Sequence, residues 1–414
     1  MLNWANRFNI CCLLDNHHYN LSHHHYECLV AAGSVRSIEA DAGNAFDKFQ
    51  SFIDLEKDWM FGHLSYDLKN EIEELYSGGY DGIQFPDLFF FVPEIILQLD
   101  ESTLTVGSVR DDHALIYQQV MASDTAIIPG AKQTVNVQSR IPKESYIDTI
   151  EHLQRHILRG DCYEINFCQE FYCEDVSIDP VQTYLALSEA SPNPFSAFYK
   201  LNNKFLLCAS PERYLKKTGA TILSQPVKGT WERNITDTRA DEINKKNLST
   251  SAKDRSENVM VVDLVRNDLA KICIEGSVKV DELFGIYKFP QVYQMISTVS
   301  GLLGDGTNLT EILKATFPMG SMTGAPKKRV MQLIEQYEPT KRGLFSGTIG
   351  YISPEKNFDF NVVIRSLLFN SLNRYLSFQA GSAITFYSDP EKEYEECLLK
   401  SSVIKKVLAG NQYS

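Results

Sequence analysis

Hydrophobic residues recur at helical spacing in several parts of the second half of the chain. Helices are predicted over 143–159, 250–271 and 326–338, with a last one from 390 toward the C-terminus. Gly160 directly after the first of these suits a helix end. Asp389 suits the N-cap of the last helix, with Pro390 in its first turn.

Alternation of apolar and polar residues predicts strands between these helices. The segments are 163–172, a meander within 195–227, and then 344–352, 360–369 and 375–385. The strands come in consecutive runs separated by helices, which favours antiparallel sheets over a repeated βαβ unit. The predicted fold class is therefore α+β.

A stretch rich in Gly, Pro and polar residues, 127–142, is predicted to be a linker. It separates an N-terminal region, 1–126, which we expect to pack on the core, from a catalytic domain, 143–404. Five of the nine histidines cluster at His17, His18, His23, His24 and His25. They lack regular ligand spacing and acidic partners, so a polar turn is favoured over a metal site.

Composition narrows the class of protein. The 414 residues are 43% hydrophobic and 22% charged, which excludes wholesale disorder. A net charge of −13 argues against a general nucleic-acid or anionic-membrane binder. We find no membrane span or signal peptide, and nine scattered cysteines contain no C-x-x-C pair. A cytoplasmic protein with buried thiols is expected.

Two predicted helices carry acids at helical spacing. Asp254 and Glu257 share a face of one, and Glu393, Glu396 and Lys400 share a face of the other. Such carboxylates suit a hard cation such as Mg²⁺. Spacing alone favours the alternative, two solvated faces with a salt bridge between Glu396 and Lys400.

Cationic and glycine-rich segments are candidate anion or nucleophile sites. Lys228, in Pro-Val-Lys-Gly-Thr, is either a surface cation, which residue type alone favours, or a desolvated nucleophile with a lowered pKa. The segment 320–326 leads into a helix and offers free N–H groups to an anion. Arg365, expected on one strand face with Asn361 and Asp359, can grip a carboxylate.

Taken together, these segments resemble the signature blocks of the chorismate-utilising enzymes. The blocks lie in unbroken order within residues 144–402: 160–167 (GDCYEINF), 210–213 (SPER), 226–230 (PVKGT), 253–260 (KDRSENVM), 262–268 (VDLVRND), 317–327, 346–351 (SGTIGY) and 388–396 (SDPEKEYEE). Each block is weak alone, but their joint order is very specific. It overturns the surface and solvated-face alternatives given above.

The resemblance implies a chorismate-binding fold with two stacked antiparallel sheets surrounded by helices. It implies Mg²⁺ held by Glu257 and Glu396, with Asp254 and Glu393 holding its waters. The positions that match substrate-binding groups are Arg365, Lys400, Thr323, Gly324, Gly381, Gly229 and Thr230. Glu212 matches the general acid that protonates the departing 4-hydroxyl, which is a poor leaving group as hydroxide.

Two positions distinguish members of this family. Members that add water resemble one another in a lysine base where this chain has Glu164, so hydration is not expected. Lys228 stands where anthranilate synthases have alanine. For members with a lysine there, the resemblance implies that its amine attacks carbon 2 as the 4-hydroxyl leaves. Ammonia then attacks carbon 4 and displaces the lysine from carbon 2, giving 4-amino-4-deoxychorismate, the precursor of 4-aminobenzoate and folate. Alternatives are anthranilate synthase component I and a non-catalytic chorismate-binding protein.

The chain departs from the family pattern at Gln294, Trp231 and Ala383, which puts substrate contacts there in doubt. Leu13–Asn16 resembles the start of a segment that holds tryptophan in related enzymes. No Gly-x-Cys-x-Gly nucleophile elbow is present. Because the family usually takes ammonia from a separate glutamine amidotransferase, we expect a heterodimer with such a subunit, and no nucleic-acid or membrane partner.

Overall fold

The computed structural model describes residues 1–19, 23, 26–123 and 135–410, where twenty-one strands form two antiparallel sheets. In spatial order, the first sheet contains β17 (Gly324–Ala325), β9 (Glu164–Cys173), β21 (Tyr375–Ile384), β20 (Ser366–Asn370), β11 (Lys204–Ser210), β10 (Phe195–Leu201), β1 (Ile10–Asp15), β2 (Cys28–Ala32), β6 (Ile95–Asp100) and β7 (Thr103–Ser108), with β8 (Gln138–Ser139) on β9. The second contains β14 (Val227–Glu232), β16 (Val292–Leu302), β13 (Thr221–Gln225), β12 (Arg213–Thr218), β19 (Phe358–Asn361), β18 (Thr348–Ile352), β4 (Met60–Leu64), β5 (Leu88–Val92) and β3 (Arg36–Ala40), with β15 (Lys279–Lys288) on β16.

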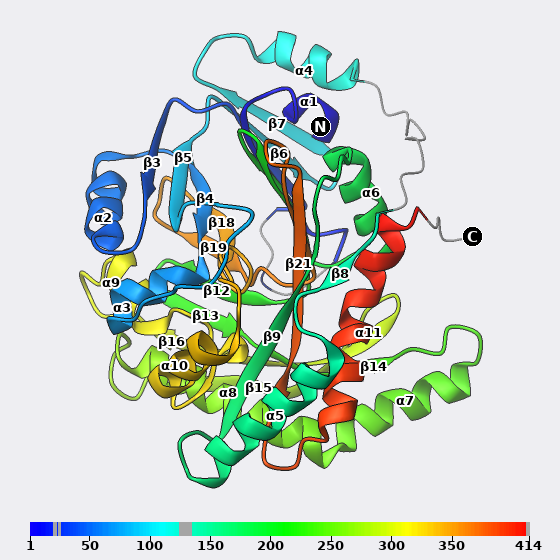
Figure 1. Cartoon of the computed structure of the whole chain (residues 1–414). Coiled ribbons are helices and arrows are strands. Elements are labelled where there is room, and N and C mark those ends of the chain that lie inside the picture. Colours follow the sequence, from blue (N-terminus) through cyan, green and yellow to red (C-terminus); the bar gives the residue numbers. More distant parts are fainter. Residues whose placement is uncertain (20–22, 24–25, 124–134, 411–414) are drawn as a thin grey trace.

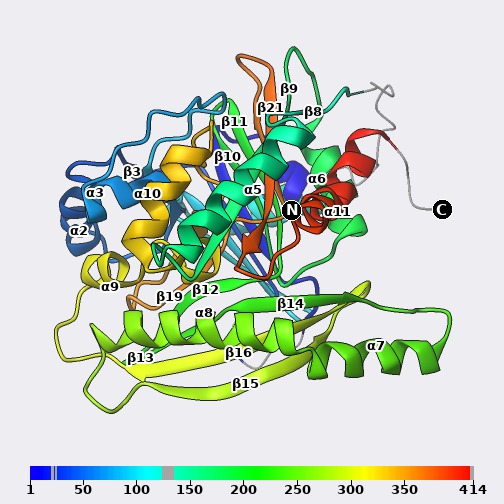
Figure 2. The same cartoon turned by 60° about the horizontal axis from the view of Figure 1, so that its bottom comes forward.

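Helices surround the two sheets. They are α1 (Leu2–Ala5), α2 (Ala45–Leu55), α3 (Lys69–Glu73), α4 (His113–Met121), α5 (Lys143–Leu158), α6 (Pro180–Ala190), α7 (Thr238–Thr250), α8 (Ala252–Ala270), α9 (Leu309–Thr316), α10 (Lys327–Tyr337) and α11 (Pro390–Leu408). In Figure 1, β9 and β21 run side by side through the middle of the molecule, with α5 and α11 beside them. Figure 2 shows α7 and α8 lying along β14 and β16. The predicted α+β class with two stacked antiparallel sheets is confirmed.

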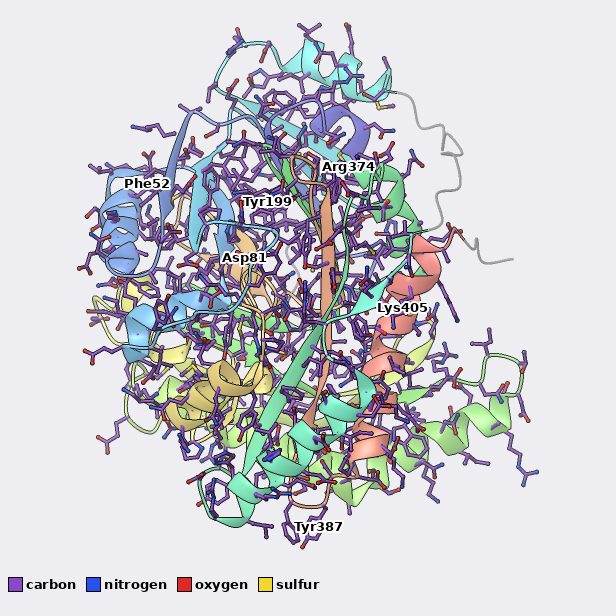
Figure 3. All side chains as sticks on the ribbon, viewed as in Figure 1. Phe52, Asp81, Tyr199, Arg374, Tyr387 and Lys405 are labelled. Atoms are coloured by element: carbon purple, nitrogen blue, oxygen red, sulfur yellow. The ribbon has the colours of Figure 1, made fainter. Side chains whose placement is uncertain are left out.

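The two sheets pack face to face over a buried aromatic core. Tyr199 of β10, labelled in the upper middle of Figure 3, is fully buried, and its hydroxyl lies 3.1 Å from Nδ1 of His63 on β4. This hydrogen bond between the sheets avoids an unpaired polar group in the core. Further apolar clusters bury the outer faces of the sheets under α5, α6 and α11, and under α2, α8 and α9.

Residues from the first third of the chain extend both sheets. Strands β1, β2, β6 and β7 continue the first sheet beyond β10, and β3, β4 and β5 continue the second beyond β18. Cys12 faces Tyr199 in the β1–β10 register, and Gly62 faces Gly350 between β4 and β18. The first half of the predicted linker, from 127 to 134, lies outside the described residues, as do His24 and His25.

The predicted helices 143–159 and 326–338, and the Asp389 cap with Pro390 in the first turn, are confirmed. The predicted long helix over 250–271 begins at Ala252, because Ser251 is extended and caps it by accepting from the Asp254 N–H. Ser251 also follows the end of α7, which the sequence pattern missed because few of its side chains are buried.

The prediction of one continuous strand over 360–369 is wrong. β19 ends at Asn361 in the second sheet, and β20 starts at Ser366 in the first. Between them the chain crosses from one sheet to the other, and Arg365 has φ +53°, a left-handed conformation that strands exclude. Arg365 therefore does not share a strand face with Asn361 and Asp359. Asp359 instead holds the guanidinium of Arg213 at 2.9 Å.

All nine cysteines are free, and all but Cys273 are buried, as predicted. No helix in the described ranges combines the length and apolar character needed to cross a bilayer.

Candidate active site

The candidate site lies where β9 begins, β21 ends and α11 starts. Figure 3 marks this end of β21 by Tyr387, which projects from the turn before α11 and is 90% exposed. Strand β14 meets the same region, because Glu164 at the start of β9 contacts Lys228 of β14. Helix α8 does so too, because its Lys253 lies 3.6 Å from Glu393 of α11. Five elements distant in sequence thus contribute side chains to one place.

A β-bulge presents Lys228 to this site. Val227 faces Ile296 and Thr230 faces Gln294, so β14 contains one residue more than β16 between these pairs. Gly229 within the bulge has φ +100°, a conformation that L-residues with side chains rarely adopt. Bulges of this kind redirect a side chain out of the regular alternation. Gly229 is therefore needed for the backbone conformation of the bulge, and Lys228 is needed for its side-chain chemistry.

Replacement of Gly229 by alanine is expected to impair the site. Its Cβ would lie 3.1 Å from Asp254 Cβ and from Leu248 Cδ1, on a strained φ. We expect a loss of roughly 1–2 kcal/mol in the free energy of unfolding and a larger fractional loss of kcat/KM, because Lys228 moves with the bulge.

The matched control is Gly219→Ala, in a turn with φ +59° and no atom within 4 Å of the added Cβ. Like Gly229→Ala, this variant puts a Cβ on a residue with a positive φ, but the added Cβ contacts no other atom. Thermal denaturation and kcat/KM measured on both variants separate stability from alignment. Equal kcat/KM losses in the two would contradict the alignment effect.

Lys228 forms a buried ion pair with Glu164. Its Nζ lies 3.0 Å from Glu164 Oε1, and the side chains are 11% and 3% exposed. The surface-cation alternative is thus wrong. The expected lowered pKa is also wrong for the substrate-free protein: burial lowers the pKa of Lys228, but Glu164, Glu257 and Glu212 together raise it above its ordinary value. The resting amine is protonated.

Glu212 is a buried carboxyl with the properties of a proton donor near neutrality. It is 3% exposed and directly precedes β12. Burial raises its pKa to about 7, although Ser321, the charge of Lys228 and the Val227 N–H all act in the opposite direction. The structure places this acid near the nucleophile candidate, as the charge interaction between Glu212 and Lys228 shows.

The two predicted acidic faces meet around one lysine. Lys253 Nζ lies 3.8 Å from Glu257 Oε1 on its own helix and 3.6 Å from Glu393 Oε1 on α11. Asp254 and Glu396 also act on Lys253 electrostatically, so all four predicted acids surround it. Separate faces in the sequence are therefore a single acidic cluster in the fold.

This cluster fits a divalent cation. Glu257 Oε1 and Glu393 Oε2 are buried and have no hydrogen-bond partner in the described residues. Burial, with Glu164 and Glu396, raises the pKa of Glu257 to about 7. No group of three or more His, Cys, Asp or Glu side chains in the described part of the chain could hold a metal unaided. Mg²⁺ often takes one or two carboxylates and completes its shell with water, so two ligands suffice.

Arg365 and Lys400 are the candidate cations for an anionic substrate. The Arg365 side chain makes no hydrogen bond or salt bridge with the described residues; burial lowers its pKa, and Glu396 acts against this. A mostly buried guanidinium without a partner is suited to a carboxylate. Lys400 is different: its Nζ contacts Glu396 Oε1 at 2.7 Å and donates to the Gly381 carbonyl at 2.9 Å.

The predicted backbone positions lie against β9. Gly324 pairs with Ile165, and an added Cβ would lie 2.1 Å from the Glu164 carbonyl oxygen. Gly381 pairs with Cys168, and its Cβ would lie 2.0 Å from the Phe167 carbonyl oxygen. Both glycines allow close backbone packing on β9, Gly324 directly against Glu164 and Gly381 further along the strand. Thr323 is fully buried, with its hydroxyl donating to the Met319 carbonyl at 3.0 Å, whereas Thr230 is exposed.

Sequence reasoning missed two features of the site. Lys253 lies within a recognised sequence block, but the sequence indicated no role for it. Its contact with Glu393 appears only when α11 packs beside α8. Asn258, fully buried, donates to the Lys228 carbonyl at 3.4 Å and accepts from Ser297 Oγ at 2.6 Å. Its place one residue after Glu257 was visible, but its contact with the bulge was not.

The departures from the family pattern lie at the edges of the site. Gln294 is buried opposite Thr230, and its Oε1 has no partner in the described residues. Ala383 faces Asn166. Trp231 Nε1 lies 3.5 Å from Asp254 Oδ2. A separate cavity of about 60 Å³ includes Leu14, Asp15 and Asn16 among its lining residues. Tryptophan binding there stays a prediction.

Comparisons with known proteins identify the family. The family model described as chorismate binding enzyme matches residues 13–406. The chain belongs to the chorismate-binding enzyme family. Anthranilate synthase component I from Streptococcus pneumoniae has a similar structure, with a TM-score of 0.78, 25% identity and coverage of 91% of each chain.

Two curated relatives carry a more particular name. Aminodeoxychorismate synthase component 1 from Escherichia coli K12 is 36% identical over 84% of this chain and 76% of its own length. The protein of the same name from Bacillus subtilis 168 is 30% identical over 90% of this chain and 80% of its own length.

Proposed function

We propose that the chain is component I of an aminodeoxychorismate synthase, which converts chorismate and ammonia to 4-amino-4-deoxychorismate. The observation that carries the proposal is Lys228, presented by a bulge and buried beside Glu164 and Glu212. An anthranilate synthase needs no nucleophile there. The similarity to aminodeoxychorismate synthase component 1 from two bacteria supports the same choice.

The first chemical step needs a neutral amine and a protonated acid. Glu164, 3.0 Å from the Lys228 amine, is placed to accept its proton. The amine then forms a bond to carbon 2 of chorismate, both ring double bonds shift by one position, and the bond from carbon 4 to its hydroxyl breaks. Glu212 donates the proton that lets this hydroxyl leave as water.

The second step places nitrogen at carbon 4. Ammonia forms a bond there, both ring double bonds shift back, and the bond between carbon 2 and the Lys228 nitrogen breaks. The amine recovers its electron pair, and a proton from the attacking ammonia returns to the site. The amino group ends para to the ring carboxylate because the lysine has occupied carbon 2.

Glu257 and Glu396 would hold Mg²⁺, with Asp254 and Glu393 orienting its waters. When bound, Mg²⁺ neutralises the ring carboxylate of chorismate. Arg365 would receive a substrate carboxylate. Lys400 neutralises Glu396 and is fixed to the Gly381 carbonyl. We further propose that ammonia comes from a glutamine amidotransferase subunit, as the component 1 names of the relatives imply.

The function is tested by incubating the protein with chorismate, Mg²⁺ and an ammonium salt, with and without an added aminodeoxychorismate lyase. We expect 4-aminobenzoate only when the lyase is present. Fluorescent anthranilate formed without lyase would indicate an anthranilate synthase. Absence of turnover under both conditions would favour a non-catalytic chorismate-binding protein.

The pH dependence should report Glu212. Because the Lys228 proton passes within its pair to Glu164, the only group that must gain a proton from solvent is Glu212, with a pKa of about 7. We expect kcat/KM for chorismate to fall about tenfold per pH unit above 7. A kcat/KM that instead keeps rising with pH above 7 would show that the Lys228 proton leaves to solvent, because the pKa of this amine is raised above its ordinary value.

A further inference from the structure

Lys253 lies between two carboxylates of different helices without a short contact to either. Its Nζ is 3.8 Å from Glu257 Oε1 and 3.6 Å from Glu393 Oε1, longer than a hydrogen-bonded ion pair. The Lys253 side chain is 59% exposed, whereas those of Glu257 and Glu393 are 14% and 2% exposed. A solvated, flexible cation thus neutralises acids that are themselves nearly buried.

No other salt bridge reaches these two carboxylates within the described residues. Lys400 makes a short 2.7 Å contact with Glu396 and is also fixed to the Gly381 carbonyl. Lys253 has no such second anchor among the residues that the structure describes. A lysine held only by long contacts can leave at little cost, because its ammonium is readily hydrated.

We infer that Lys253 is a built-in counterion that a divalent cation must displace, so that this residue sets the affinity of the site for Mg²⁺. The inference rests on the proposed function, which assigns Mg²⁺ to Glu257 and Glu396. In the metal-free protein Lys253 screens the mutual repulsion of the acids. When a cation enters, the two positive charges oppose each other, and Lys253 turns outward to solvent.

The test is calorimetric titration of the substrate-free protein with MgCl₂ at low ionic strength. Lys253→Met removes the competing charge while retaining the aliphatic stem, and we expect its Kd for Mg²⁺ to be about tenfold lower than that of the unmodified protein. Lys253→Arg restores the charge and should return the Kd toward the original value. The difference should shrink in high salt.

Lys406→Met is the matched control. Lys406 is exposed near the end of α11, so the variant loses the same charge far from the acids. Its Kd should be unchanged. The Mg²⁺-induced rise in Tm gives a second readout, and it should be largest for Lys253→Met, whose metal-free form carries uncompensated acids.

Equal Kd values in the unmodified protein and Lys253→Met would overturn the inference while leaving the metal site intact. A higher Kd in Lys253→Met would also overturn it, since Lys253 would then hold the acids in place rather than compete. No Mg²⁺ binding by any of the proteins would overturn the metal site of the proposed function, and the role of Lys253 with it.

Discussion

Lys228→Ala should abolish formation of 4-amino-4-deoxychorismate, with a loss of at least about 10³-fold in kcat. Without the amine no bond forms at carbon 2, so ammonia has no activated intermediate to attack at carbon 4. The variant is expected to yield anthranilate or nothing. The measurement is product analysis after incubation with chorismate, Mg²⁺ and ammonium, with added lyase to reveal any 4-amino product.

Lys228→Ala also leaves Glu164 as a buried charge without its partner, which on its own can cost about 3–5 kcal/mol of stability. Two further variants separate chemistry from folding. Lys228→Arg keeps the charge opposite Glu164 but cannot lose a proton to become a nucleophile. The double variant Lys228→Ala/Glu164→Gln removes both charges together. We expect both to fold and to lack the 4-amino product; full retention of that product in either would sink the assignment of the nucleophile.

Glu212→Gln should lower kcat by about 10²–10⁴-fold, because the amide matches the shape of the acid but cannot protonate the departing hydroxyl. The measurement is the initial rate of chorismate consumption at pH 6.5, where most of the unmodified acid is protonated. The alkaline decline in kcat/KM should also disappear in this variant. A variant with unchanged kcat would assign the proton donor to another group.

The thermal stability of Glu212→Gln serves as a control, because the direction of its change in Tm can be predicted. The pKa of Glu212 rises from its ordinary 4.5 to about 7 on folding, so stability present at acid pH is lost as pH rises through 7. At pH 8 the ionised, buried carboxylate costs the unmodified protein roughly 3 kcal/mol relative to acid pH. The Tm of Glu212→Gln should therefore exceed that of the unmodified protein at pH 8. A lower Tm would show that the substituted amide disrupts packing, and the kinetics of this variant would then not isolate proton transfer.

Local patterns were the predictable part of the fold. The Asp389 cap, the helix that Gly160 follows and the strands at 163–172 and 375–385 depend on neighbours in sequence, and the structure has them within a few residues. The interrupted strand around Arg365 was not predictable in this way. Its apolar residues are buried on both sides of the break, so the hydrophobic pattern continues while the chain passes from one sheet to the other.

The ordered sequence blocks indicated which residue types form the candidate site. They did not indicate the protonation states or the ion pairs of these residues. Its sequence block singled out Lys228, yet a lowered pKa was wrong for the resting state, because Glu164 lies 64 residues away in the chain and 3.0 Å away in space. The four acids were correctly paired on their own helices by spacing. Lys253, which lies among all four, has a role only once α8 and α11 meet.

By itself, the sequence determined the family, the α+β class, and the residue types able to hold a cation, donate a proton and attack a ring. These depend on side-chain chemistry and on periodicities set by the local backbone. Only the tertiary structure decided that a bulge presents Lys228, that Glu164 pairs with its ammonium, and that Lys253 neutralises the acids. Distances between remote segments are set by how both sheets and their helices bury apolar surface together, and no local pattern encodes that packing.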